Sequence, residues 1–223
     1  MDRSSPERAA QTLLASLAER CEHDGFGTMS ASVYDTAWLS MVRKDNEWLF
    51  PECFEFVLEK QLPSGAWESY ATSADGILNT AAALLSLKRH LNTWQLLGTP
   101  REPDVPNDDR DRKVLDRIEK AEVALKRLLN EWNMDSTDQV GFEILVVSLL
   151  NLIEQEGGMA MEFPALDALR AVRNQKLAKL PPSTLYQMSS TLYHSLEAFI
   201  GHIDFDRVRR WQEPNGSMMG SPA

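Results

Sequence analysis

The hydrophobic positions along this chain recur mainly with the spacing of α-helices, and no convincing strand-like alternation interrupts them. Apolar residues keep to one helical face over residues 7–21 and again over residues 114–132. Residues 144–153 are apolar nearly all round, which predicts a helix buried on several sides. Pro51 and Pro164 stand where the first turn of a helix tolerates proline. The pattern predicts an all-α fold of roughly eight to ten helices with short connections.

Three further segments complete this prediction. Residues 99–112, TPREPDVPNDDRDR, combine three prolines with a run of charges, which predicts a solvent-exposed loop. Residues 185–199 keep large apolar side chains on one face, which predicts a last long helix. Asp75 precedes a helix rich in small residues and is expected to cap it.

The stretch over residues 61–87 divides into a turn, QLPSGAW, and the small-residue helix DGILNTAAALLSL. The proline, serine and glycine of the turn preset or permit turn geometry. Gln61 is expected to bond main-chain groups left open where helices end, and Trp67 to cover the bend. An ordinary turn between helices explains these residues equally well. A similar pattern returns over residues 211–217, which suggests helices stacked in a ring and stapled at their ends.

Composition narrows the classes of function. The 223 residues have room for one large or two small domains, and a net charge of −10 argues against a nucleic-acid binder. An anionic ligand would therefore need a local basic cluster. Cys21 and Cys53 make neither a disulfide framework nor a metal set, which favours an intracellular setting. No membrane-spanning run and no signal-peptide pattern is found, so a cytoplasmic protein is expected.

The turn QLPSGAW resembles the Q-x-x-x-G-x-W turn of triterpene and class II diterpene cyclases. Further segments agree in order with the amino-terminal part of class II diterpene cyclases of the copalyl diphosphate synthase type, especially fungal ones. These segments are SASVYDTAW at 30–38, WLFP at 48–51, DGILNTAAALLSL at 75–87, VGFEILVVSLL at 140–150, KLAKLP at 176–181, TLYHSLEAFIG at 191–201 and NGSMMGSP at 215–222. The resemblance covers almost the whole chain, and the ordered set is more specific than any one motif.

The resemblance implies a fold and a division into domains. The all-α fold becomes an α/α-barrel, the double ring of helices called the γ domain, which is expected over residues 30–223. In the family this domain is inserted after the first helix of a second barrel, the β domain. Residues 1–29 would be that first helix, whose apolar face has little to bury against without the rest of the β domain.

The resemblance also implies a reaction. Class II cyclases of this type, isomerases of terpenoid biosynthesis, cyclise geranylgeranyl diphosphate to copalyl diphosphate or a related bicyclic diphosphate, with Mg²⁺ at the diphosphate. The reaction begins by protonation of an alkene, and the acid is an aspartate of an Asp-x-Asp-Asp motif in the β domain. This motif is absent from the sequence, and so is the Asp-Asp-x-x-Asp metal motif of class I synthases. The chain is therefore expected to be part of an enzyme and inactive alone.

Three residues are singled out for chemistry by the resemblance. His194, in TLYHSLEAF, matches a histidine that helps to form the terminal general base in plant copalyl diphosphate synthases; a packed core histidine is the alternative. Lys176, in KLAKLP, matches a lysine near the substrate diphosphate, and a solvated basic helix face is the alternative. Glu143, in VGFEIL, matches an acidic position associated with Mg²⁺. A buried ion pair or a helix cap explains Glu143 equally well.

Two other functions remain open at this point. The chain could be a truncated, non-catalytic helical domain, either a gene remnant or a docking and regulatory module for a β-domain partner. An unrelated α/α-toroid hydrolase or prenyltransferase subunit is disfavoured, because neither paired catalytic carboxylates nor zinc ligands are evident.

Overall fold

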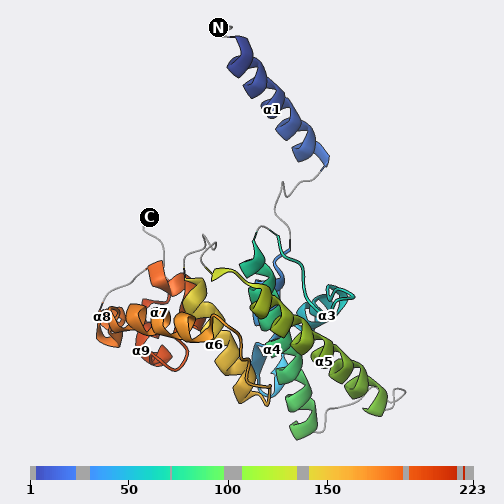
Figure 1. The fold of residues 1–223 in the computed structure, drawn as a ribbon, viewed down its shortest axis with the longest axis vertical. Coiled ribbons are helices and arrows are strands. Elements are labelled where there is room, and N and C mark those ends of the chain that lie inside the picture. The colour runs from blue at the N-terminus through green and yellow to red at the C-terminus, as the bar shows by residue number, and fades with distance from the viewer. Residues whose placement is uncertain are drawn as a thin grey trace. The chain divides into compact units, whose positions relative to one another are not determined.

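The computed structural model describes residues 4–23, 31–70, 72–97, 107–134, 141–187, 191–214 and 218. The chain forms two compact units, residues 1–32 and 33–223. The first unit contains helix α1 (Ser4–His23), which agrees with the helix predicted over residues 7–21 (Figure 1). Its side chains are exposed wherever they are described, and Leu13 and Leu14 are each about two-thirds exposed.

The second unit begins with two helices joined by a small hairpin. Helix α2 (Val33–Ser40) is followed by strands β1 (Arg43–Lys44) and β2 (Glu47–Trp48) and then by α3 (Pro51–Glu59), whose first position is the predicted proline. The hairpin turn places Asp45 and Asn46 at positive φ, a conformation that these two residue types tolerate. Strands of two residues are too short to show an alternating pattern, so the hydrophobic spacing does not predict them.

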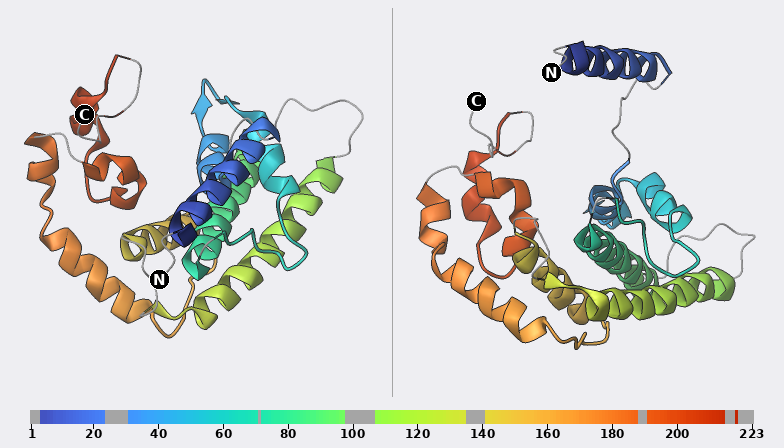
Figure 2. Two further views of the ribbon diagram at one scale, coloured as in Figure 1. Left: turned by 90° about the horizontal axis from the view of Figure 1, so that it is seen from above. Right: turned by 45° about the horizontal axis from the view of Figure 1, so that its top comes forward.

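Three helices form the centre of the second unit. They are α4 (Ser73–Leu97), α5 (Asn107–Glu131) and α6 (Phe142–Gln155). Helix α4 packs against α2, α5 and α6, and both views of Figure 2 show it between α5 and the α2–α3 region. Its alanines at 81–83 are wholly buried, so small side chains let the neighbouring helices approach closely. Nine residues of α6 are buried, which confirms the prediction of a helix covered on several sides.

Two predictions for these helices need adjustment. The loop predicted over residues 99–112 is wrong at its end, because α5 already begins at Asn107 and includes the charged run DDRDR. Carboxylates are favourable in the first turn of a helix, where the backbone N–H groups are unpaired. Residues 98–106 lie outside the described residues. Asp75 does not precede α4 but lies in its first turn, where its Oδ2 accepts from the Thr72 N–H at 2.8 Å.

The carboxyl-terminal part of the second unit consists of shorter helices. These are α7 (Leu166–Ala178), α8 (Pro182–Gln187), the 3₁₀ helix η2 (Thr191–Phe199), α9 (Phe205–Val208) and the 3₁₀ helix η3 (Arg209–Trp211). The long helix predicted over 185–199 is therefore wrong. The backbone at Ser195 is not helical (φ −134°, ψ 48°), and the Tyr193 hydroxyl donates to the Leu185 carbonyl, which holds η2 against α8.

The QLPSGAW turn is tied to α5 by its glutamine. The Gln61 amide donates to the carbonyls of Gly65 and Arg117, both at 3.0 Å, and its oxygen accepts from the Arg117 guanidinium at 3.1 Å. Gly65 has φ +86°, and a Cβ there would lie 2.3 Å from the Lys120 carbonyl oxygen. Only glycine therefore fits, and the prediction that Gln61 bonds open main-chain groups is confirmed.

Trp67 covers the bend as predicted. Its ring is 2% exposed, and Nε1 donates to the Val57 carbonyl at 2.8 Å, where α3 ends. The second turn is only partly similar: Trp211 is half-buried, and its Nε1 has no hydrogen-bond partner among the described residues. Gln212 pairs with Met218 in an isolated β-bridge, and residues 215–217 lie outside the described residues.

The described residues contain nine α-helices and two 3₁₀ helices, with the one small hairpin. The all-α prediction is confirmed. None of these helices combines the length and the apolar character that crossing a membrane requires.

Candidate functional site

The amino-terminal end of α6 buries a carboxylate. Glu143 lies in the first turn of this helix and is 2% exposed. Gly141 precedes the helix at φ +89°, a conformation that glycine adopts without strain. The unpaired N–H groups of a first helical turn favour a negative charge, so this position suits an ionised glutamate better than the helix interior would.

Lys176 of α7 contacts this carboxylate. Its Nζ lies 2.5 Å from Glu143 Oε1, and the Lys176 side chain is 45% exposed. The oxygen is otherwise unsupported, because it forms no hydrogen bond of normal geometry with any described residue. The ion-pair alternative for Glu143 is therefore what the structure contains. The Lys176 side chain thus contacts a buried carboxylate while remaining 45% exposed.

Arg173 lies one turn before Lys176 on α7. Its Nε is buried without a hydrogen-bond partner among the described residues, and burial lowers the pKa of its guanidinium. Arg170 and Lys179, which recur at the same three-residue spacing, are exposed. Three of the four basic residues are therefore exposed, and of these Lys176 also contacts the buried Glu143, whereas Arg173 is partly buried. Arg173 and Lys176 form the local basic group that an anion would require in a chain of net charge −10.

His194 belongs to η2, and its side chain lies outside what the structure describes. The sequence placed it on an α-helical face with Glu197, but the break at Ser195 lies between the two residues. Helical spacing therefore does not relate them. Ser148 of α6 donates from its hydroxyl to the Ala198 carbonyl at 2.8 Å, which holds η2 against α6.

Helix α6 connects the elements that carry the candidate residues. It bears Glu143, packs against α7 with Lys176, and packs against η2 with His194. Glu143 and Lys176 are in contact, whereas no contact of the His194 side chain is described.

A polar pair that the sequence analysis missed lies on the other side of η2. Tyr34 of α2 donates its hydroxyl hydrogen to Glu197 Oε1 at 3.0 Å. Burial, and then the Glu197 charge, raise the pKa of Tyr34 far above its usual value. Burial also raises the pKa of Glu197. Tyr34 and Glu197 stand in the segments SASVYDTAW and TLYHSLEAFIG, but no local pattern links residues so far apart in sequence.

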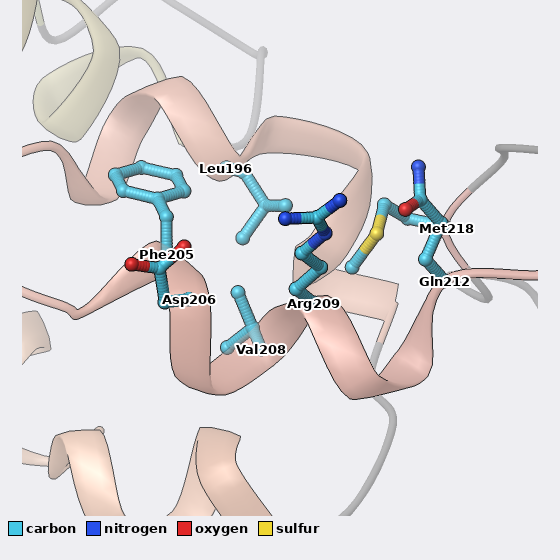
Figure 3. Close-up of a pocket in the computed structure, with 7 residues that line it drawn as sticks. All are labelled: Leu196, Phe205, Asp206, Val208, Arg209, Gln212 and Met218. Carbon is cyan, nitrogen blue, oxygen red and sulfur yellow. The ribbon is translucent and has the colours of Figure 1, made fainter.

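A hollow of about 380 Å³ opens beside η2 and the elements that follow it. Figure 3 shows Leu196, Val208 and Met218 around this space with the Arg209 side chain among them. Phe205, Asp206 and Gln212 complete the lining. This lining combines apolar side chains with one cation, one carboxylate and one amide.

Few of the described residues fit the implied Mg²⁺. The described part of the chain contains no group of three histidine, cysteine or acidic residues able to hold a metal. Glu143 is a single buried carboxylate whose Oε1 already contacts the Lys176 ammonium. Mg²⁺ is often held by one or two carboxylates with substrate phosphates and waters as the other ligands, and only this mode fits Glu143.

Comparison with known proteins finds similar diterpene synthases. The chain is 45% identical over 224 aligned residues to a copalyl diphosphate synthase of Talaromyces verruculosus, covering 97% of this chain and 22% of that protein. Over most of its length the chain is therefore similar to proteins named copalyl diphosphate synthase and to related diterpene synthases. It is also 44% identical over 208 residues to a pimaradiene synthase of Emericella nidulans, covering 92% of this chain and 20% of the relative. The chain thus spans about a fifth of the length of these relatives. No protein-family model matches it.

A solved diterpene synthase structure has a similar fold. Abietadiene synthase from Abies grandis matches 96% of this chain and 27% of its own, with a TM-score of 0.67 and 25% identity. The predicted α/α-barrel of a terpene cyclase is confirmed.

Proposed function

We propose that this chain is the γ-domain part of a class II diterpene cyclase. Residues 30–223 are the γ domain, and residues 1–29 are the first helix of the β domain. The complete enzyme converts geranylgeranyl diphosphate into copalyl diphosphate or a related bicyclic diphosphate by protonation and ring closure. The observation that carries this proposal is the 45% identity to a copalyl diphosphate synthase over nearly the whole chain.

The Glu143–Lys176 pair is proposed to bind the diphosphate. An ammonium is a suitable point-charge partner for phosphate oxygens. Glu143 holds Lys176 from the protein side, and the 45% exposure of the lysine side chain leaves donors for an incoming anion. Arg173 adds positive charge one turn away. Glu143 is the residue that would hold Mg²⁺, which when bound neutralises diphosphate charge.

The acid that starts the reaction does not come from these residues. Protonation of an alkene requires a strong, positioned acid, and the sequence lacks the Asp-x-Asp-Asp motif. His194 is proposed to act at the other end of the reaction. A neutral imidazole accepts a proton near neutral pH and can take the last proton from the carbocation, directly or through water.

The proposal is tested by adding a β domain to the chain. The purified chain is incubated with geranylgeranyl diphosphate and Mg²⁺, with and without a separately made β-domain fragment of a close relative. A bicyclic diphosphate is expected only from the mixture. Lys176→Gln should greatly reduce product, whereas Lys179→Gln, a matched change of an exposed lysine near the end of the same helix, should not. His194→Ala should change the product or slow its formation.

A non-catalytic role is the second candidate function of this chain. The observation behind it is that the sequence contains no Asp-x-Asp-Asp motif. In this role the chain is a gene remnant or docks on a β-domain partner. A folded chain that binds the β-domain fragment, without product in any mixture, would favour the docking role.

A further inference from the structure

Tyr34 and Glu197 join the first helix of the second unit to a segment at its other end. The Tyr34 hydroxyl donates to Glu197 Oε1 at 3.0 Å, and 163 positions of sequence separate the two residues. We propose that this pair is a positioning contact that fixes η2 against α2 and thereby sets the place of His194. The inference rests on the proposed role of His194, but the contact can be tested without any cyclase activity.

The backbone of η2 gives the reason that such a contact is needed. A 3₁₀ helix has poorer hydrogen-bond geometry than an α-helix, and runs of this length are uncommon. The non-helical residue Ser195 interrupts it further (φ −134°, ψ 48°). A segment with these two weaknesses depends on contacts to its neighbours for a defined position.

Besides the bond from Tyr193 to the Leu185 carbonyl, two side chains from different helices supply such contacts. Ser148 of α6 donates to the Ala198 carbonyl at 2.8 Å, and Tyr34 of α2 donates to the neighbouring Glu197. Both bonds attach on the carboxyl-terminal side of Ser195, within four residues of His194. Trp38 packs edge-on against the Tyr34 ring with 6.3 Å between centroids, so the donor itself is held in place.

The charges around Glu197 make the pair responsive to pH. Burial is the main cause of its raised pKa; Asp35 of α2 acts in the same direction, and the hydrogen bond from Tyr34 opposes both. From α6, the neighbouring polar group is the uncharged Ser148 hydroxyl. Tyr34 stays a neutral donor across the physiological range because its own pKa is raised by burial and by Glu197. Glu197 is therefore the member of the pair that titrates.

Hydrogen exchange of the 223-residue chain tests the contact. Tyr34→Phe removes the donor while keeping the ring, and Tyr70→Phe at an exposed tyrosine is the matched control. A hydrogen bond to a charged acceptor is strong enough that its loss should speed amide exchange over residues 191–199 about tenfold. Exchange in α5 should not change. Glu197→Ala should act like Tyr34→Phe, whereas Glu197→Gln keeps an acceptor and should restore most of the protection.

Two further readouts separate positioning from general stabilisation. Tyr34→Phe should raise the pKa of Glu197, because the hydrogen bond that favours the ionised form is lost. Carbon NMR of the Glu197 carboxyl group measures this pKa. The imidazole signal of His194, identified by its loss in His194→Asn, should broaden or split in Tyr34→Phe but not in Tyr70→Phe. Unchanged exchange over 191–199, or an equal rise across all helices, would overturn the proposal. Failure of cyclase reconstitution would leave these results unaffected.

Discussion

The turn at residues 61–67 and the amino-terminal end of α6 both bury polar atoms, but the two regions differ in how these atoms are paired. In the turn, Gln61 satisfies two carbonyls and one guanidinium donor, and Trp67 uses its indole N–H. At α6, Glu143 is equally buried, yet its Oε1 has only the contact with the half-exposed Lys176.

The difference lies in how the buried polar groups are paired. The turn bonds its buried groups within the fold, and the hollow of about 390 Å³ beside it is lined by turn residues and by charged side chains of α5. A buried carboxylate whose oxygen contacts only one partly exposed cation is costly, and local departures of this kind are most often found at functional sites. The first region therefore stabilises the fold, and the second carries the proposed chemistry.

The largest effect is expected from Gly65→Ala. The new Cβ would lie 2.3 Å from the Lys120 carbonyl oxygen at a φ of +86°, so the turn must separate from α5. Urea unfolding should show a loss of about 3 kcal/mol or more, or no folding. Gly157→Ala is the control, since it has φ +79° but nothing within 4 Å, and strain alone should cost about 1 kcal/mol. Equal losses for the two variants would show that the contact with Lys120 contributes nothing.

A smaller effect is expected from Lys176→Met. It removes the cation that contacts Glu143 and leaves a buried charge without its partner, at a cost of about 2 kcal/mol given the partial exposure of the lysine. The double change Glu143→Leu with Lys176→Met should recover most of this loss, because no buried charge remains. If the double variant is less stable than Lys176→Met alone, the pair stabilises the fold and the contrast with the turn fails.

The smallest effect is expected from Glu197→Gln and concerns pH. Since the pKa of Glu197 is higher in the folded chain than in the unfolded one, the folded state binds more protons between these two values. Its contribution to stability is therefore fully present below the unfolded pKa near 4.3 and is lost as pH rises through the folded pKa. The difference in melting temperature between wild type and Glu197→Gln should shift in favour of the variant from pH 4 to pH 7. A constant difference would contradict the raised pKa.

The sequence predicted those parts of the fold that local patterns encode. The spacing of apolar residues identified α1, α5 and α6, and the composition of QLPSGAW indicated both its turn and the bonding of Gln61. The same approach failed where tertiary contacts override periodicity. Residues 185–199 have a helical pattern, but Ser195 breaks the helix and Tyr193 folds it back onto Leu185.

The candidate site was predicted less completely than the fold. The resemblance named Glu143 and Lys176 separately, and only the packing of α6 against α7 brings them into an ion pair. The Tyr34–Glu197 pair could not be found from the sequence, because a hydrogen bond between distant segments leaves no local spacing to recognise. Domain bounds at residues 29 and 30 and the role of His194 stay predictions.

A chimera tests the central claim most directly. The region of the Talaromyces verruculosus copalyl diphosphate synthase that aligns with this chain is replaced by the chain itself, and the product from geranylgeranyl diphosphate is measured. The account predicts a folded chimera that forms a bicyclic diphosphate, with activity lost in Lys176→Gln and kept in Lys179→Gln. A folded chimera that makes no product, or one that is indifferent to Lys176→Gln, would contradict it.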